Sequence, residues 1–177
     1  MLRCVLPDRP GALAKVARAI SEIGGDIQAV DVVEHRDGRA LDDLELLLDE
    51  DRVPTLLQRI TALEGVKVVH AGPSRGNPGD GVTRLSIGIE SLLNGSAEPR
   101  RGLQTLIGGM LRARSAEFVR PEDVPSADLR CLALEVGDDV LLLQRDYRFT
   151  ATEQERARAL LRVAVRAIST VSDHAQA

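Results

Sequence analysis

The stretch that decides the fold of the first half of the chain is LRCVLPDRPGAL, residues 2–13. In residues 2–6, Leu, Cys and Leu take every second position, which is the pattern of a half-buried strand. The segment Pro7-Asp8-Arg9-Pro10-Gly11 ends that strand, and apolar residues then recur at helical spacing from Leu13 to Ile23. The stretch therefore predicts a strand that turns tightly into an amphipathic helix.

Outward from this stretch, residues 1–71 predict the order strand, helix, strand, strand, helix, strand. Gly24-Gly25 ends the first helix, and the residues from Asp26 to Glu34 are rich in β-branched side chains. Asp37-Gly38 is a strong hairpin signal. A second helix and a last strand follow, on the apolar positions Val53, Leu56, Leu57, Ile60 and Leu63, and then Val66 and Val68.

A two-residue turn at Asp37-Gly38 would set the pairing of the hairpin. Arg36 would then face Arg39, Asp31 would face Leu44, and Ala29 would face Leu46. The face predicted to lie under the helices carries Ile27, Ala29, Leu44, Leu46 and Leu48, with Asp31 and Asp42 as a solvated diagonal pair. The opposite face carries Val5, Gln28, Val30, Val32, Asp43, Glu45, Leu47 and Val69, and is apolar enough to need a cover from a second subunit or from the rest of the chain.

Residues 72–81 combine glycine, proline and polar residues without periodicity, which predicts a linker between two domains. We expect a first domain at 1–71 and a smaller mixed α/β module at 82–177. In that module the pattern favours helices at 85–93 and 103–111, a strand at 116–120 and a hairpin over 129–145. The final helix is predicted to begin with a capping box formed by Thr152 and Glu155.

Composition excludes several classes of protein. The chain is 44% apolar and 28% charged with a net charge of -4, and its charges are interspersed, which argues against a nucleic-acid surface. Neither a signal peptide nor an apolar run of membrane-spanning length occurs, so we expect a cytoplasmic protein with no membrane partner. Cys4 and Cys131 predict buried reduced thiols. The three histidines lack the spacing of a metal site, and no cofactor motif is present.

The first half resembles an ACT domain over residues 1 to about 71. The resemblance is carried by the βαββαβ order, the Asp8-Arg9-Pro10-Gly11 turn into an Ala-Leu helix, and the Gly25-Asp26-Ile27 start of the second strand. It implies a ferredoxin-like fold that binds amino acids or other small ligands, usually at subunit interfaces, and regulates an enzyme. The combination is similar to standalone ACT proteins of actinobacteria, and the C-terminal half more faintly resembles a shortened GAF-type sensor.

The turn into the first helix is the predicted ligand site. Gly11 lacks a Cβ, so a ligand can approach the backbone, and the N–H groups of Gly11, Ala12 and Leu13 can hold a carboxylate. Asp8 and Asp26 are expected to lie near one another and to receive an ammonium group. The predicted ligand-binding residues are Asp8, Arg9, Pro10, Gly11, Ala12, Leu13, Asp26 and Ile27. The same turn is also compatible with a helix start that binds nothing.

In the family, the positions of Asp8 and Asp26 are often Asn or Asp. This chain has Asp at both positions, so the resemblance implies a more negative site and favours a ligand with an amine group. Leu6 stands where some serine-binding members carry His, so a serine ligand is not implied. We therefore expect a non-catalytic sensor of a small amino acid, forming a homodimer through the edge strand 26–34. The alternative is a pure assembly module without a ligand. An enzyme ranks third, because three His, one Tyr and no Trp offer little to build an active site.

Overall fold

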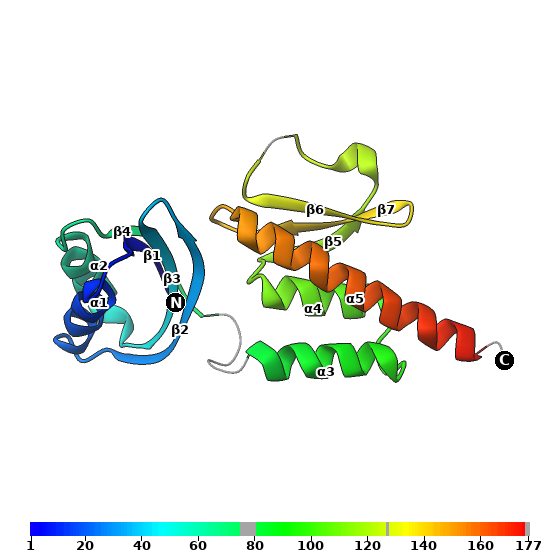
Figure 1. Cartoon of the computed structure of the whole chain (residues 1–177), viewed down its shortest axis with the longest axis horizontal. Helices are drawn as coiled ribbons and strands as arrows, with labels where there is room; N and C mark the ends of the chain where they lie inside the picture. Colours follow the sequence, from blue (N-terminus) through cyan, green and yellow to red (C-terminus); the bar gives the residue numbers. More distant parts are fainter. Residues whose placement is uncertain (75–80, 127, 176–177) are drawn as a thin grey trace. The chain divides into compact units, whose positions relative to one another are not determined.

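The structure is a computed structural model that describes residues 1–74, 81–126 and 128–175 of the chain. The chain divides into two compact units, residues 1–79 and 80–177, each with its own sheet and hydrophobic core (Figure 1). Most of the predicted linker at 72–81 lies outside the described residues, which stop at Ser74 and resume at Gly81.

The first unit has the predicted order of strands and helices. Its elements are β1 (Leu2–Pro7), α1 (Ala12–Ser21), β2 (Asp26–Arg36), β3 (Arg39–Leu47), the short 3-10 helix η1 (Glu50–Arg52), α2 (Val53–Thr61) and β4 (Lys67–Ala71). The strands form one antiparallel sheet in the order β2-β3-β1-β4. Both helices cover the same face of this sheet (Figure 1). The hydrophobic core lies between the helices and the sheet. The ferredoxin-like α+β fold predicted for this half is confirmed.

The pairing of β2 with β3 agrees with the prediction only near the turn. Arg36 faces Arg39 as expected, but the register then shifts twice along β2, between Val32 and Glu34 and between Ile27 and Ala29. These are β-bulges, each of which places one extra residue on β2. As a result, the predicted pairs are wrong beyond the bulges, where Asp31 faces Asp43, Ala29 faces Glu45 and Val30 faces Leu44.

Between the two bulges, the side chains of β2 also point to the faces of the sheet opposite to those predicted. Val30 and Val32 share the helix side of the sheet with Leu44 and Asp42, their cross-strand partners, and each is 42% exposed. Asp31 pairs with Asp43 on the opposite side of the sheet from Asp42. The predicted diagonal pair of Asp31 and Asp42 on one face is therefore wrong.

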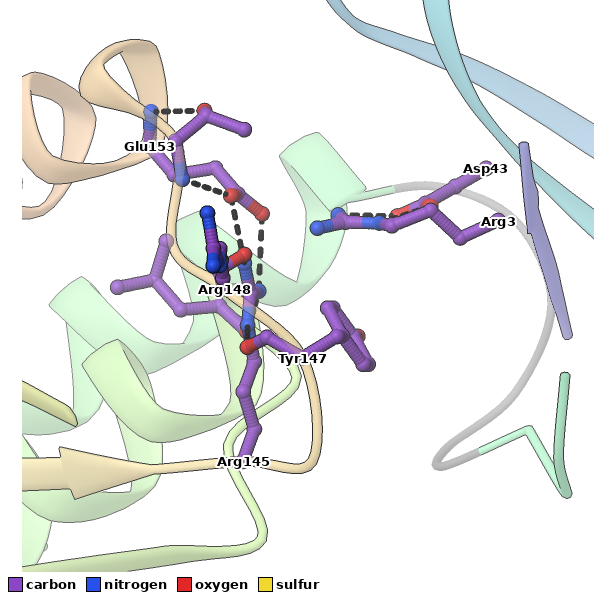
Figure 2. A network of polar contacts seen from close by, with 8 residues as sticks. Arg3, Asp43, Arg145, Tyr147, Arg148 and Glu153 are labelled. Carbon is purple, nitrogen blue, oxygen red and sulfur yellow. Dashed lines mark hydrogen bonds and ion pairs between the residues drawn. The ribbon is translucent and has the colours of Figure 1, made fainter. Parts of the chain in front are cut away.

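The face of the sheet opposite the helices carries a buried ion pair. Arg3 of β1 donates to both carboxylate oxygens of Asp43 of β3, its cross-strand neighbour, at 2.6 and 2.8 Å (Figure 2). Nearby, Ser74 donates to Glu45 at 2.6 Å, and Gly72 exchanges hydrogen bonds with Met1. The chain that leaves β4 is thus held along β1 and β3.

The second unit is also α/β. Its elements are α3 (Gly81–Leu93), α4 (Pro99–Met110), β5 (Ser115–Val119), the 3-10 helix η2 (Pro121–Asp123), β6 (Cys131–Val136), β7 (Asp139–Gln144) and α5 (Ala151–Ala175). The strands form an antiparallel sheet in the order β5-β7-β6. The three helices lie together on one face of it, and leucines from α4, β6, β7 and α5 fill the core between them (Figure 1). The predicted mixed α/β class is confirmed, but the module, residues 80–177, is larger than the first unit and not smaller as expected. Its likeness to a GAF sensor stays a prediction.

A buried arginine joins β7, α4 and α5. Both terminal nitrogens of Arg145 donate to Glu153 of α5, at 2.8 and 2.6 Å, and the same guanidinium donates to three backbone carbonyls, those of Leu111, Tyr147 and Arg148 (Figure 2). Its carbon lies 3.9 Å from the ring centre of Phe149. Every donor direction of the guanidinium is thus used within the unit, so we assign Arg145 a structural role.

The capping box of α5 lies two residues before the predicted one. Thr150 accepts from the N–H of Glu153 at 3.1 Å, and Glu153 accepts from the N–H of Thr150 at 2.8 Å (Figure 2). The prediction of Thr152 and Glu155 is wrong because Glu153 is also the partner of Arg145, which fixes where the helix begins. Among the described residues, no helix combines the length and the apolar character that a bilayer crossing requires.

Candidate functional site

The turn between β1 and α1 is closely packed. Gly11 has φ of +85° and directly precedes α1, where no side chain caps the helix. The N–H of Arg9 donates to Pro7 and that of Ala12 donates to Arg9. A Cβ at Gly11 would meet no atom within 4 Å, so its open side faces solvent. One of the three predicted N–H donors, that of Ala12, is thus used within the turn.

A shallow hollow lies on the α2 side of this turn. It is open to solvent and encloses a volume of only about 30 Å³. The residues that line it are Pro7, Arg9, Pro10, Gly11, Ala12, Lys15, Leu63, Glu64 and Val66. Arg9 and Lys15 are cations and Glu64 is a carboxylate. A ligand that complements these charges carries both signs, with more negative than positive charge.

The wall of the hollow on the α2 side is fixed by Gly65. This glycine has φ of +77°, and a Cβ there would lie 2.9 Å from Cγ of Pro7. Arg39 of β3 donates to its carbonyl oxygen at 2.7 Å. The turn after α2 is therefore packed directly against the end of β1, and only glycine fits both the backbone conformation and the space.

Asp8 lies on the other side of the turn, towards the β2-β3 hairpin. Its N–H donates to the carbonyl of Gly38, and its carboxylate lies 3.1 Å from Nδ1 of His35. Both side chains are about half exposed, at 47% and 58%. Asp8 therefore does not line the hollow, and the turn separates a cationic side from an anionic one.

Asp26 lies far from Asp8, so the expectation that they are neighbours is wrong. Asp26 begins β2 beside Leu47, whereas Asp8 follows Pro7, which lies beside Arg39. Eight residues along β3 separate these positions, on the order of 25 Å at the rise of an extended strand. The two acids flank opposite ends of α1, because β1 and β2 run in the same direction. Asp26 accepts from Gln28, and Ile27 packs against the core, as does Leu13.

The helix side of the sheet near Asp8 contains a second carboxylate, that of Asp42. It is 2% exposed, and its Oδ1 atom has no hydrogen-bond partner among the described residues. Burial raises its pKa and nearby Asp43 adds to the rise, whereas His35 opposes it. Its cross-strand neighbour Cys4 is fully buried, and burial, with Asp42 and Asp43, raises the pKa of that thiol to about 12.

Five residues of the hollow, Pro7 among them, are outside the predicted ligand-binding set, although the sequence contains a signal for two of the five. Lys15 lies four residues after Gly11, one helical turn along the same face, and Glu64 precedes a glycine that ends a helix. Leu63 and Val66 carry only the signal of core positions. In the parts of the chain that the structure describes, no cluster of three or more His, Cys, Asp or Glu could hold a metal.

The geometry agrees with a comparison to known families. The model of the ACT domain family matches residues 1–65, from the start of the chain to the turn after α2. The first unit is an ACT domain with ferredoxin-like topology. ACT domains are regulatory modules that typically bind amino acids, and this supports a regulatory role for the first unit. The chain thus joins an ACT domain to a second α/β unit.

Comparisons over the whole chain add little. No curated protein matches it. A solved structure, the ligand-free regulatory subunit of aspartate kinase from Thermus thermophilus, is similar at 14% identity over 94% of this chain and 92% of that chain, with a TM-score of 0.32. A likeness at this level carries no argument about function, so the assignment depends on the family match alone.

Proposed function

We propose that the chain is a regulatory protein whose ACT domain binds a small amino acid at the turn between β1 and α1. The observation that carries the proposal is the hollow at the start of α1, where Arg9, Lys15 and Glu64 surround the open side of Gly11. Neither cation forms an ion pair within the described residues. Both are therefore available to a ligand in solution.

The carboxylate of the ligand would lie at the start of α1. The positive end of a helix attracts anions, and the backbone approach at Gly11 is unobstructed. Lys15 lies one turn further along the same helix face and adds a second positive charge. An α-amino acid offers one carboxylate for this end and an ammonium group for Glu64 or for Asp8 at the edges of the turn.

Asp26 can join the site only from a second copy of the chain. β2 is an edge strand of eleven residues, and two such strands can pair antiparallel about a twofold axis. With the axis at Asp31, the central residue of β2, Asp26 of one copy would face Arg36 of the other. That position adjoins His35, which contacts Asp8. A homodimer through β2 would therefore bring together the two acids that lie apart in one copy.

Isothermal titration of the full chain against each of the twenty amino acids tests the proposal. We expect at least one to bind, with affinity lowered at least about tenfold by Lys15→Met or Glu64→Gln, a loss of about 1.4 kcal/mol. Arg162→Ala, which removes an exposed cation from α5 in the other unit, is the matched control and should leave binding unchanged. Absence of heat above dilution for all twenty, or equal binding by all variants, would refute ligand binding at this turn.

The second candidate is an assembly module that dimerises through β2 and binds nothing. The exposure of Val30 and Val32 on this edge strand favours it. It predicts the same dimer but no rise of the melting temperature with any amino acid, because only a ligand that prefers the folded state raises that temperature. Thermal melts of the full chain with and without each amino acid separate the two candidates. The amino acid is added at about 10 to 100 times its expected Kd, so that binding would raise the melting temperature measurably.

A further inference from the structure

The ACT domain contains a buried acid that the proposed ligand site does not use. Asp42 lies in the middle of β3, between Cys4 of β1 and Val32 of β2 on the helix side of the sheet. It is 2% exposed, and its Oδ1 has no hydrogen-bond partner among the residues described. An ionised carboxylate in such a place is unfavourable unless it is paired, so the site prefers a protonated group or access to water.

The strand beside Asp42 is bulged where it pairs with β3. The register shift between Val32 and Glu34 places the extra residue Val33 directly beside the Val32–Asp42 pair. Only the three pairs from Glu34 to Arg36 join β2 to β3 between this bulge and the turn. This bulge interrupts the ladder of hydrogen bonds between β2 and β3. Separation of this short segment would expose Asp42 to water.

The charged groups around Asp42 come from several elements. Cys4 on β1 is a neutral thiol, and the acids Asp8, Asp31 and Asp43 all disfavour a further negative charge. His35 on β2 instead favours a negative charge on Asp42. From the helices, the residues in this core are apolar, and Lys15 and Arg18 of α1 are exposed. Arg3 is paired with Asp43, and among the described residues no arginine or lysine forms an ion pair with Asp42 on its own side of the sheet.

We propose that the protonation state of Asp42 controls whether the hairpin end of β2 stays paired with β3. With the carboxyl protonated, the segment Val32 to Arg36 remains closed. When the carboxyl ionises, the segment separates from β3 and admits water to the carboxylate. Because the folded state keeps the proton more tightly than the unfolded chain does, closure is favoured at low pH. It is lost as the pH rises above the ordinary range of an aspartate.

Hydrogen exchange of the full chain between pH 4.5 and pH 8, corrected for the intrinsic chemical rate, measures this opening in peptides that cover residues 28–40. We expect the protection factor of this segment to fall about tenfold or more as the pH rises. The reason is that an opening linked to the loss of one proton changes its equilibrium constant by up to about tenfold for each pH unit. Asp42→Asn, which cannot ionise, should abolish the dependence on pH. Asp37→Asn, which removes an exposed acid from the hairpin turn, is the control and should retain it.

Two further measurements keep the proposal open to refutation. His35→Gln removes the imidazole that contacts Asp8 at this end of the hairpin. If that variant loses the pH dependence while Asp42→Asn keeps it, the contact between Asp8 and His35 is responsible and the proposal fails. If Asp42→Asn does not fold, the ¹³C shift of the Asp42 carboxyl in the unsubstituted chain decides. A midpoint in the ordinary range of an aspartate overturns the proposal, and a clearly higher one supports it.

Discussion

Arg145 and Glu153 form a bidentate ion pair inside the second unit, with distances of 2.8 and 2.6 Å between nitrogen and oxygen. Removal of one partner would leave the other charge buried, which typically costs about 3–5 kcal/mol. We expect Glu153→Met and Arg145→Met each to destabilise the second unit by about this amount. The double variant Arg145→Met with Glu153→Met should lose less than the sum of the two single changes.

The single tyrosine makes this measurement local. Tyr147 is the only Tyr in a chain without Trp, and it lies in the second unit beside Arg145, so its fluorescence reports the unfolding of that unit in urea. Additive losses in the double variant would show that the pair contributes no coupling. In that case the bonds from Arg145 to the backbone carbonyls would account for its burial.

The glycine at the wall of the hollow predicts a difference between two matched substitutions. Gly38 and Gly65 both have positive φ, but a Cβ meets nothing at Gly38 and would meet Pro7 at Gly65. Gly38→Ala should cost about 1–2 kcal/mol from backbone strain alone. Gly65→Ala should cost at least about 1 kcal/mol more, because Pro7 must move. Hydrogen exchange in peptides from β1 and β4 measures the loss, and equal effects would contradict the close packing.

The two thiols should react at very different rates. Cys4 is fully buried and burial raises its pKa to about 12, so almost no thiolate exists at pH 8, whereas Cys131 is half-buried. In the folded chain we expect Ellman's reagent to titrate one thiol promptly and the second only after denaturant is added. Cys131→Ser should remove the prompt reaction and Cys4→Ser should keep it. Prompt reaction of both thiols would mean that the sheet is more open near Cys4 than the structure indicates.

The edge strand predicts which apolar residue matters for assembly. Val30 of β2 is 42% exposed at the edge, and Leu47 of β3 is 69% exposed in an inner strand. A lysine on an edge strand disfavours pairing with another strand. In sedimentation velocity we expect the unsubstituted chain and Leu47→Lys to be dimers and Val30→Lys to be a monomer. If Val30→Lys still dimerised, another surface would be the interface.

The fold of the first unit could be predicted from the sequence because its signals are local. Asp37-Gly38 fixed the hairpin turn, and the turn residues from Pro7 to Gly11 placed the first strand and helix. The pairing of Arg36 with Arg39 followed directly. The bulges beside Gln28 and Val33 could not be predicted in this way, because they leave no turn residue or break in the β-branched run. They depend on how β2 fits β3 over its whole length.

The candidate site was only partly predictable for a related reason. Residues 9–12 line the hollow as contiguous neighbours in sequence. The position of Asp26, by contrast, depends on the direction of β2 relative to β1, and the prediction placed it at the wrong end of α1. Likewise, the cap of α5 depends on the long-range partner of Glu153, which no local pattern reveals.

The two edge strands of this sheet also limit the size of any polymer that the domain can form. A twofold pairing consumes the β2 edge of both copies, and the other edge of each sheet is β4, a strand of five residues that begins with the exposed Lys67. A free, long edge can recruit strands without end and seed a fibre, whereas an edge already paired about a twofold axis and a short charged edge offer no such template. Association through this sheet would therefore close at two chains.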